Sequence, residues 1–369
     1  MTATTDQALK VAMVCPYSVG VPGGVQIQAI GLARELQRMG HEVDVLTLCD
    51  GPTPDPVVIP LGKSLPMSAN GSVALISLSP LTAVRVRRAL RQGDYDVVHI
   101  HEPLIPAVSH MALMGKCGPK VGTFHAAGVL PLYRLFAPAL RWMLKRLDYR
   151  VAVSKDARAL VETTLGGSYE TLFNGIEQAE FEAAIPHPAT RPTIFFLGRH
   201  EERKGLGVLL DAISKIDLDI ACWIGGVGPD TDELKKRYGD DDRLEWLGRI
   251  DEADKLARLR GASVFCAPSL YGESFGIVLL EGMAALTPVV ASRLDGYQNV
   301  ATDGVDALLV PPGDADALAE ALVKVLTDHD LADRLAAAGR ERARQLSMEE
   351  LASRYVEIYR QVLARRATS

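Results

Sequence analysis

Two glutamates, Glu273 and Glu281, are separated by seven mainly apolar residues. The preceding segment 262–268 is apolar enough for a buried strand, and Gly272 permits a sharp turn. We predict a helix that starts near Ser274 and turns its first free backbone N–H groups toward a phosphate. Glu273 would stand at the mouth of that anion site and Glu281 further along the helix. Two carboxylates at different depths beside one anion suit a sugar joined to a diphosphate.

Arg199 and Lys204 bracket a second candidate anion site. They follow the predicted strand 193–197 and Gly198, and they precede a predicted helix. A guanidinium fork and a compact ammonium together suit a diphosphate leaving group. Two solvated surface cations are the alternative. A glycine turn that contains Gly226 follows the next predicted strand, where a nucleotide can approach the backbone closely.

The first predicted strand, at 11–15, leads into a glycine-rich turn. Gly23, Gly24 and Gln26 lie where this turn opens a helix, so its N–H groups can approach phosphate or sugar oxygens. The turn does not follow the G-x-G-x-x-G pattern, which argues against a nicotinamide or flavin dehydrogenase. A plain structural turn explains the two glycines equally well.

Three histidines follow or line predicted strands. His125 closes the strand 121–124, where its side chain is expected to face a ligand cleft. His99 and His101 alternate along another strand and therefore lie on one face of it. No third ligand accompanies them, so we expect no metal site.

Short strand-like runs alternate with amphipathic helical stretches along the whole chain. This alternation predicts an α/β protein with parallel sheets covered by helices on both faces. The predicted strands are 11–15, 43–48, 97–100, 121–124, 150–153, 193–197, 220–224, 244–246, 264–267, 289–291 and 308–310. The predicted helices are 25–39, 83–92, 205–214, 251–260, 314–326, 331–344 and 348–363. Turn-forming residues between 174 and 190 predict a linker between two doubly wound domains that face a central cleft.

The bulk properties fit a soluble protein of two domains. The chain has 369 residues, 48% hydrophobic and 23% charged, and a net charge of −6. It offers no apolar run long enough for a membrane span, and residues 1–10 lack the apolar core of a secretion signal. Five scattered cysteines predict reduced thiols in the cytoplasm. The net negative charge gives no reason to expect nucleic acid.

Positive charge is concentrated in the first half of the chain. Residues 81–158 contain 13 Lys or Arg against 5 Asp or Glu. Within them, the segment 130–150 mixes apolar, aromatic and basic residues, which is typical of helices that lie on anionic membranes. The alternative is a helix packed on its own sheet, with solvated cations.

These motifs together resemble the retaining glycosyltransferases of family 4, which have the GT-B fold. The resemblance extends from Val11 to about Val362. Within the family, the chain is similar to the members that transfer mannose to phosphatidylinositol. The motifs that carry the resemblance are 13–18, 21–26, 70–73, 99–103, 123–125, 173–175, 198–199, 204–205, Glu273 with Glu281, and 287–292.

The resemblance implies how the donor is held. Arg199 and Lys204 would bind its diphosphate, Glu281 its ribose hydroxyls, and Glu273 the transferred sugar. The expected donor-binding set is Gly24, Gly198, Arg199, Lys204, Gly226, Ser274, Phe275, Gly276, Ile277 and Glu281. The expected catalytic set is His125, Arg199, Lys204 and Glu273.

The resemblance also implies the acceptor side and the domain organisation. Tyr17, Gln26, Asn70 and His125 would contact the acceptor. Residues 1–174 would form the acceptor-side domain and 175–347 the donor domain. The last helix, in 348–369, would return to the first domain.

The implied reaction is retaining transfer of a hexose, with mannose from GDP-mannose as the first choice and a lipid-linked acceptor such as phosphatidylinositol. No metal or other cofactor is expected. Alternatives are a UDP-sugar donor, a soluble or isoprenoid acceptor, and a nucleotide-sugar-binding protein or epimerase without transfer. The expected location is the cytoplasm, with peripheral contact with the inner face of the cell membrane as a further option.

Three departures from the family pattern concern the acceptor and the nucleotide region. The run after His125 is Ala126–Leu130, where similar members carry hydroxyl residues and a lysine. Residues 74–78 replace an arginine-bearing stretch, and Leu286 replaces the usual glycine. Cations that would hold an inositol phosphate are therefore missing, although Arg85 and its neighbouring arginines remain.

Overall fold

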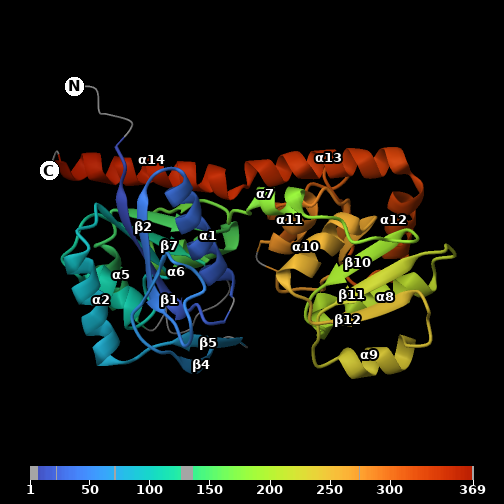
Figure 1. The fold of residues 1–369 in the computed structure, drawn as a ribbon, viewed down its shortest axis with the longest axis horizontal. Coiled ribbons are helices and arrows are strands. Elements are labelled where there is room, and N and C mark those ends of the chain that lie inside the picture. Colours follow the sequence, from blue (N-terminus) through green and yellow to red (C-terminus); the bar gives the residue numbers. More distant parts are fainter. Residues whose placement is uncertain (1–6, 22, 70–71, 126–135, 274, 368–369) are drawn as a thin grey trace. The chain divides into compact units, whose positions relative to one another are not determined.

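The chain forms two compact α/β units, each built on a parallel sheet (Figure 1). The computed structural model describes residues 7–21, 23–69, 72–125, 136–273 and 275–367. Unit 1 comprises Met1–Gly175 together with Met348–Ser369, and unit 2 comprises Ile176–Ser347. Some positions discussed above lie outside the described residues. They are Asn70, Ser274 and the part 130–135 of the basic segment 130–150.

Unit 1 contains a seven-stranded sheet whose neighbouring strands all pair in parallel. In spatial order its strands are β3 (Val58–Pro60), β2 (Glu42–Leu48), β1 (Lys10–Ser18), β6 (Val97–His101), β7 (Lys120–Phe124), β8 (Tyr149–Ala152) and β9 (Glu170–Thr171). Its described helices are α1 (Gly24–Arg38), α2 (Pro80–Gln92), α3 (Val108–Met114), α5 (Ala137–Leu144), α6 (Lys155–Leu165) and α14 (Met348–Ala367). A separate antiparallel pair, β4 (Leu65–Ala69) and β5 (Ser72–Ile76), completes the unit.

Unit 2 contains a six-stranded sheet, also parallel throughout. In spatial order its strands are β12 (Leu244–Gly248), β11 (Ala221–Gly225), β10 (Thr193–Leu197), β13 (Val264–Ala267), β14 (Val289–Ser292) and β15 (Leu308–Val310). Its helices are α7 (Gln178–Ala183), η1 (Glu202–Lys204), α8 (Leu206–Ser214), α9 (Thr231–Tyr238), α10 (Glu252–Gly261), α11 (Ile277–Ala284), η2 (Tyr297–Asn299), α12 (Ala315–Thr327) and α13 (His329–Gln345).

The central strands are buried because helices cover both faces of each sheet. β6 and β7 are buried along their whole length, as are β13 and β14. Continuous apolar strands of this kind are what parallel sheets require. The last helix, α14, contributes a buried stripe to unit 1. That stripe consists of Ala352, Tyr355, Val356, Ile358, Tyr359 and Val362.

Side-chain caps fix where several helices begin. Ser154 accepts a hydrogen bond from the Ala157 N–H at the start of α6. Asp314 and Asp328 do the same for α12 and α13. Each such cap satisfies a backbone donor that the helix itself leaves unpaired and contributes about 1 kcal/mol.

The helix predicted to start near Ser274 begins instead at Ile277. Gly276 has φ of +96°, in the left-handed region, so the helix cannot extend back through it. Glu281 therefore lies in the second turn of α11, closer to the helix start than expected. Six further helices of the described chain were not predicted, namely η1, α3, α6, α7, α9 and η2. Most of them are short, and α9 has no buried residue.

The strand order of each sheet reverses at one point beside its first strand. In unit 1 the chain moves outward from β1 on one side and from β6 on the other. In unit 2 the reversal lies between β10 and β13. Ligands of open α/β sheets bind beyond the carboxyl ends of the strands at such switch points. A ligand-binding site is thus expected at the loops that follow β1, β6, β10 and β13.

The left-handed backbone conformation of Leu286 can be tested by substitution. Leu286 has φ of +61°, a value that costs a side-chain-bearing residue about 1 kcal/mol or more. Leu286→Gly should therefore be more stable than Leu286→Ala by about 1 kcal/mol, since both lose the side chain and only glycine relieves the strain. Urea unfolding of the two variants measures the difference. An alanine variant as stable as the glycine variant would contradict the left-handed conformation.

Candidate active site

The loops that follow β10 and β13 meet at the carboxylate of Glu273. Lys204 Nζ lies 2.5 Å from Glu273 Oε1, and Ser269 Oγ donates to the same oxygen at 3.1 Å. Arg203 Nη1 is 3.5 Å from it. The Lys204 and Glu273 side chains are only 20% and 13% exposed, so this ion pair is shielded from solvent. No described residue binds Oε2 of Glu273, which leaves that oxygen for a ligand.

Cations outnumber carboxylates in this cluster. Arg199 and Arg203 share Glu201, at 3.4 Å and 2.7 Å, while Lys204 and Arg203 share Glu273. Three cations thus face two carboxylates, an excess of one positive charge. The Arg199 side chain is 66% exposed, so its guanidinium can reorient toward a ligand. The predicted pair Arg199 and Lys204 belongs to one charge network that can accept an anion.

Glycines allow the loops of unit 2 to approach one another. A Cβ on Gly226, whose φ is +112°, would lie 1.9 Å from the carbonyl oxygen of Gly198. A Cβ on Gly205, whose φ is +70°, would lie 1.9 Å from the carbonyl oxygen of Pro268. Only glycine fits these two positions. The structure therefore brings Gly198 and Gly226 together, and it holds the Lys204 loop against the loop after β13.

Glu281 lies in α11 and forms an ion pair with a lysine that the sequence analysis did not single out. Lys255 Nζ, from α10, is 2.9 Å from Glu281 Oε1 and 2.7 Å from Glu252. Burial raises the pKa of Glu281 above its ordinary value, and the charge of Lys255 opposes that rise. The charge of Lys255 favours the ionised form of this carboxylate, and an ionised carboxylate accepts hydrogen bonds from hydroxyl groups.

The segment before α11 rests on a buried tyrosine. A Cβ on Gly276 would lie 2.8 Å from the Tyr297 ring, and Tyr297 OH is 2.9 Å from Ser269 Oγ. Phe275 is buried and Ile277 is half-buried. Tyr297 thus links the Glu273 cluster to the backbone at the start of the helix.

In unit 1, two of the predicted acceptor residues lie close together along the chain. Tyr17 is near the carboxyl end of β1, and Gln26 is at the start of α1. Tyr17 is half-buried in β1, and burial raises the pKa of its hydroxyl. Gln26 Nε2 donates to the carbonyl oxygen of Ser18 at 3.2 Å, so this side chain folds over its own turn. Gly24 is exposed, with open space around it. Asn70 lies outside the part of the chain that is described.

His125 is held by two partners from the neighbouring strand. Its backbone N–H donates to Glu102 Oε1 at 2.6 Å, and its Nε2 lies 2.9 Å from His101 Nδ1. Glu102 itself has φ of +46°, a strained value of the kind that is concentrated at functional sites. Burial lowers the pKa of His125 and of His101, so both rings are neutral at pH 7.

A second hydrogen-bond chain lies behind these histidines. His99 Nδ1 is 2.7 Å from Tyr359 OH, and His99 Nε2 is 2.7 Å from Thr123 Oγ1. Thr123 Oγ1 is in turn 2.8 Å from Tyr355 OH. The His99 and His101 rings stack with centroids 4.5 Å apart. The C-terminal helix therefore supports the strand that holds His125.

The direction of the His101–His125 hydrogen bond follows from burial. Nε2 of His101 is buried and has no partner among the described residues. A buried donor without an acceptor costs more than a buried lone pair, so we expect His101 to carry its hydrogen on Nδ1. His125 Nε2 then accepts the hydrogen bond from His101 Nδ1. The neutral His125 ring therefore carries its hydrogen on Nδ1, and this nitrogen can donate a hydrogen bond but cannot accept one.

Arg203, Lys255, Glu102 and Ser269 support the site without having been predicted. Arg203 lies inside a predicted motif, and its position beside Lys204 was the available signal. Glu102 lies inside the motif 99–103, which was its available signal. Lys255 and Ser269 carry no local pattern, because Lys255 meets Glu281, and Ser269 meets Tyr297, only in the folded chain. Within the described ranges, no group of three or more His, Cys, Asp or Glu side chains could hold a metal ion. No helix there is both long and apolar enough to cross a membrane.

The fold and the clustered loops define a glycosyltransferase of the GT-B class. The family model described as "Glycosyltransferase Family 4" matches residues 22–180, and the one described as "Glycosyl transferases group 1" matches residues 177–342. A solved glycosyltransferase from Rickettsia africae superposes with a TM-score of 0.76 over 97% of this chain and 99% of its own, at 20% identity. HepE from Anabaena, solved with UDP and glucose, superposes with a TM-score of 0.72. The match covers 96% of this chain and 100% of HepE, at 17% identity.

Sequence relatives identify the family. The chain is 40% identical over 364 residues to a phosphatidyl-myo-inositol mannosyltransferase of Mycolicibacterium smegmatis, covering 96% of this chain and 94% of that protein. It is also 40% identical to the protein of that name from Mycobacterium leprae, covering 96% and 97%. The chain belongs to glycosyltransferase family 4. The predicted α/β fold with two Rossmann-like halves is thereby confirmed, as is the predicted resemblance.

Removal of the Lys255 charge should make stability depend on pH through Glu281. In Lys255→Met the pKa of Glu281 should rise further, and the folded protein should then bind more protons than the unfolded chain near neutral pH. The free energy of unfolding should fall by about 2 kcal/mol at pH 8 and by less at pH 5. Urea unfolding at the two pH values measures this, with the exposed Lys324→Met as control. An equal loss at both values would contradict a buried charged Glu281.

The tautomer of His101 can be observed directly. Long-range 1H–15N spectra of the neutral protein should place its hydrogen on Nδ1. His101→Asn, whose amide nitrogen can replace Nδ1, should keep most of the transferase kcat, while His101→Leu should lose about tenfold. A hydrogen on Nε2 of His101 would contradict the direction of this bond, whatever the two variants do.

Proposed function

We propose that this protein transfers mannose from GDP-mannose to phosphatidylinositol, with retention of configuration, at the cytoplasmic face of a membrane. The observation that carries the proposal is the shielded Lys204–Glu273 ion pair, with Arg203 and the exposed Arg199 beside it, at the switch point of unit 2. Names of relatives at 40% identity support the choice of mannose and of the phosphatidylinositol acceptor.

Unit 2 would bind the donor. Arg199 and Lys204 take the diphosphate, which supplies the negative charge that balances the excess cation of the cluster. When Lys204 turns to the diphosphate, Oε1 of Glu273 joins Oε2 in accepting hydrogen bonds from the hydroxyls of mannose. Glu281, kept ionised by Lys255, accepts from the ribose hydroxyls. Gly198 and Gly226 let the nucleotide approach the backbone.

The chemistry needs charge stabilisation more than a protein nucleophile. As the bond from the anomeric carbon to the diphosphate breaks, negative charge develops on the leaving oxygen. Glu201 and Glu273 hold Arg199 and Lys204 beside the donor site, and once both side chains turn to the diphosphate their charges stabilise the leaving oxygen. A glycosidase would need two carboxyl groups on either side of the reacting bond. Glu273 and Glu281 instead have separate lysine partners and separate roles.

Unit 1 would hold the acceptor. The neutral His125, with its hydrogen on Nδ1, donates a hydrogen bond to a hydroxyl of the sugar or of the acceptor. Tyr17 and Gln26 contribute polar groups from β1 and α1. The Nε2 of Gln26 must leave the Ser18 carbonyl to bind a ligand, which a single side-chain rotation achieves.

Thermal stabilisation by nucleotides tests the donor. GDP-mannose at 100 times its dissociation constant should raise the free energy of unfolding by about 2.7 kcal/mol, and UDP-glucose should not. Transfer of radiolabelled mannose to phosphatidylinositol in mixed micelles then tests the acceptor, and NMR of the product gives the anomeric configuration. Stabilisation by UDP-sugars alone would replace the donor and leave the fold and the cluster unchanged.

Lys204→Ala should lower kcat on the order of a hundredfold, about 3 kcal/mol, because one prealigned charge is lost from the transition state. Lys215→Ala is the matched control. Lys215 lies directly after α8, and its exposed side chain pairs with Asp316 of α12. Lys215→Ala should melt near the wild type, whereas Lys204→Ala loses a shielded ion pair with Glu273, so kcat is compared at a temperature at which both variants are folded. Wild-type turnover by Lys204→Ala would remove the diphosphate contact from the mechanism.

A further inference from the structure

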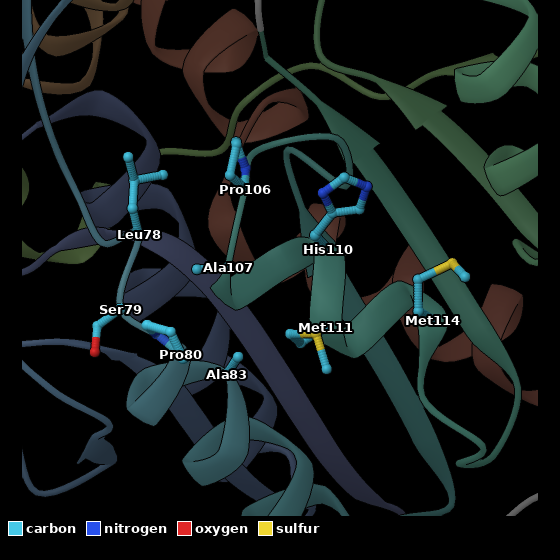
Figure 2. A pocket seen from close by; sticks show the side chains of 9 residues that line it. All are labelled: Leu78, Ser79, Pro80, Ala83, Pro106, Ala107, His110, Met111 and Met114. Atoms are coloured by element: carbon cyan, nitrogen blue, oxygen red, sulfur yellow. The ribbon is translucent and has the colours of Figure 1, made fainter.

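An apolar cavity lies between the start of α2 and α3 in unit 1 (Figure 2). Its volume is about 370 Å³. Leu78, Pro80 and Ala83 line one side of it, and Met111 and Met114 line the other. A volume of this order is within the range of small-molecule sites. Its walls are almost entirely hydrocarbon and thioether.

Several of the few polar groups at the cavity already have partners. The carbonyl oxygen of Ser79 accepts from the Ala83 N–H at 3.3 Å, and the Ser79 N–H donates to Ser77 Oγ at 3.2 Å. The Nε2 of His110 lies 2.9 Å from Met143 Sδ. Burial lowers the pKa of His110, so the ring is neutral at pH 7. An occupant of this cavity gains by burying apolar surface rather than by hydrogen bonding.

The surface around the cavity combines apolar side chains with positive charge. Leu78 is 55% exposed, and Leu81 and Val84 on α2 are also exposed. The α2 segment contains four arginines and no acidic residue; the arginines are Arg85, Arg87, Arg88 and Arg91. Apolar walls beside a wholly cationic helix complement a molecule that joins a hydrocarbon chain to an anionic group.

The cavity is also tied to the strand that holds the acceptor histidines. α3 follows β6 in sequence, and Ser109 Oγ donates to the carbonyl oxygen of His101 at 2.8 Å. His101 in turn contacts His125. Both α3 and His125 thus lie beyond the carboxyl ends of adjacent strands, β6 and β7.

We propose that this cavity holds one acyl chain of the lipid acceptor, with the lipid phosphate beside the arginines of α2. The identity of the acceptor rests on the proposed function, while the binding of a hydrocarbon chain does not. The acyl chain fixes the lipid at the carboxyl edge of the sheet, so that its head group lies near His125. Each methylene that enters the cavity should tighten binding by up to about fourfold.

The first test measures binding without turnover. The probe is cis-parinaric acid, a fluorescent unbranched fatty acid. Ala83→Phe fills the cavity, and Val84→Phe adds the same ring at an exposed position of the same helix. Wild type and Val84→Phe should bind the probe, and Ala83→Phe should bind at least tenfold more weakly. Met111→Trp fills the cavity from the other wall and should behave like Ala83→Phe. Unchanged binding by both filled variants would overturn the proposal.

The second test uses monomeric phosphatidylinositols with acyl chains of increasing length. In the wild type KM should fall as the chain lengthens, whereas in Ala83→Phe it should not, with equal kcat on the deacylated head group. The same chain-length dependence in both proteins would overturn the proposal. If no phosphatidylinositol is a substrate but the filled variants still lose the probe, the cavity stands and the acceptor is wrong. Stronger displacement of the probe by an isoprenyl phosphate would overturn the acyl assignment.

Discussion

The carboxylate of Glu273 joins the two loops on which the donor side of this protein depends. One oxygen of that carboxylate accepts from Lys204, which follows β10, and from Ser269, which follows β13. These loops flank the point where the strand order reverses, so the ion pair lies where a parallel sheet offers its binding crevice. The pair is shielded and carries a neighbouring excess of positive charge. It therefore holds Lys204 in place without neutralising the cluster, as the proposed diphosphate contact requires.

In unit 1, a hydrogen-bond network positions the candidate site residue His125. Tyr355 and Tyr359 of α14 hold Thr123 and His99, and His99 stacks on His101, which contacts His125. These groups are neutral, and all but the half-buried His125 are buried, so the network fixes orientation rather than charge. The last twenty-residue helix thus supports the strands that carry these histidines through packing, although it is the most distant part of the chain in sequence.

Much of this architecture could be predicted from the sequence, for identifiable reasons. The strands at Thr193–Leu197 and Val264–Ala267 have the predicted bounds because continuous apolar runs between turn residues leave little choice. The glycine before Arg199 marked the end of the first of these strands. The start of α11 was misplaced because the left-handed φ of Gly276 depends on contact with Tyr297, a residue 21 positions away. Lys255 and Ser269 were missed for the same reason, since their partners meet them only in the folded chain.

The most direct test is a crystal structure with GDP-mannose bound. In the complex, Lys204 Nζ should leave Glu273 and lie within hydrogen-bond distance of the diphosphate. Glu273 should then bind hydroxyls of mannose, and Glu281 should bind the ribose while keeping Lys255. A complex in which Lys204 remains on Glu273 and the diphosphate lies elsewhere would contradict the central claim.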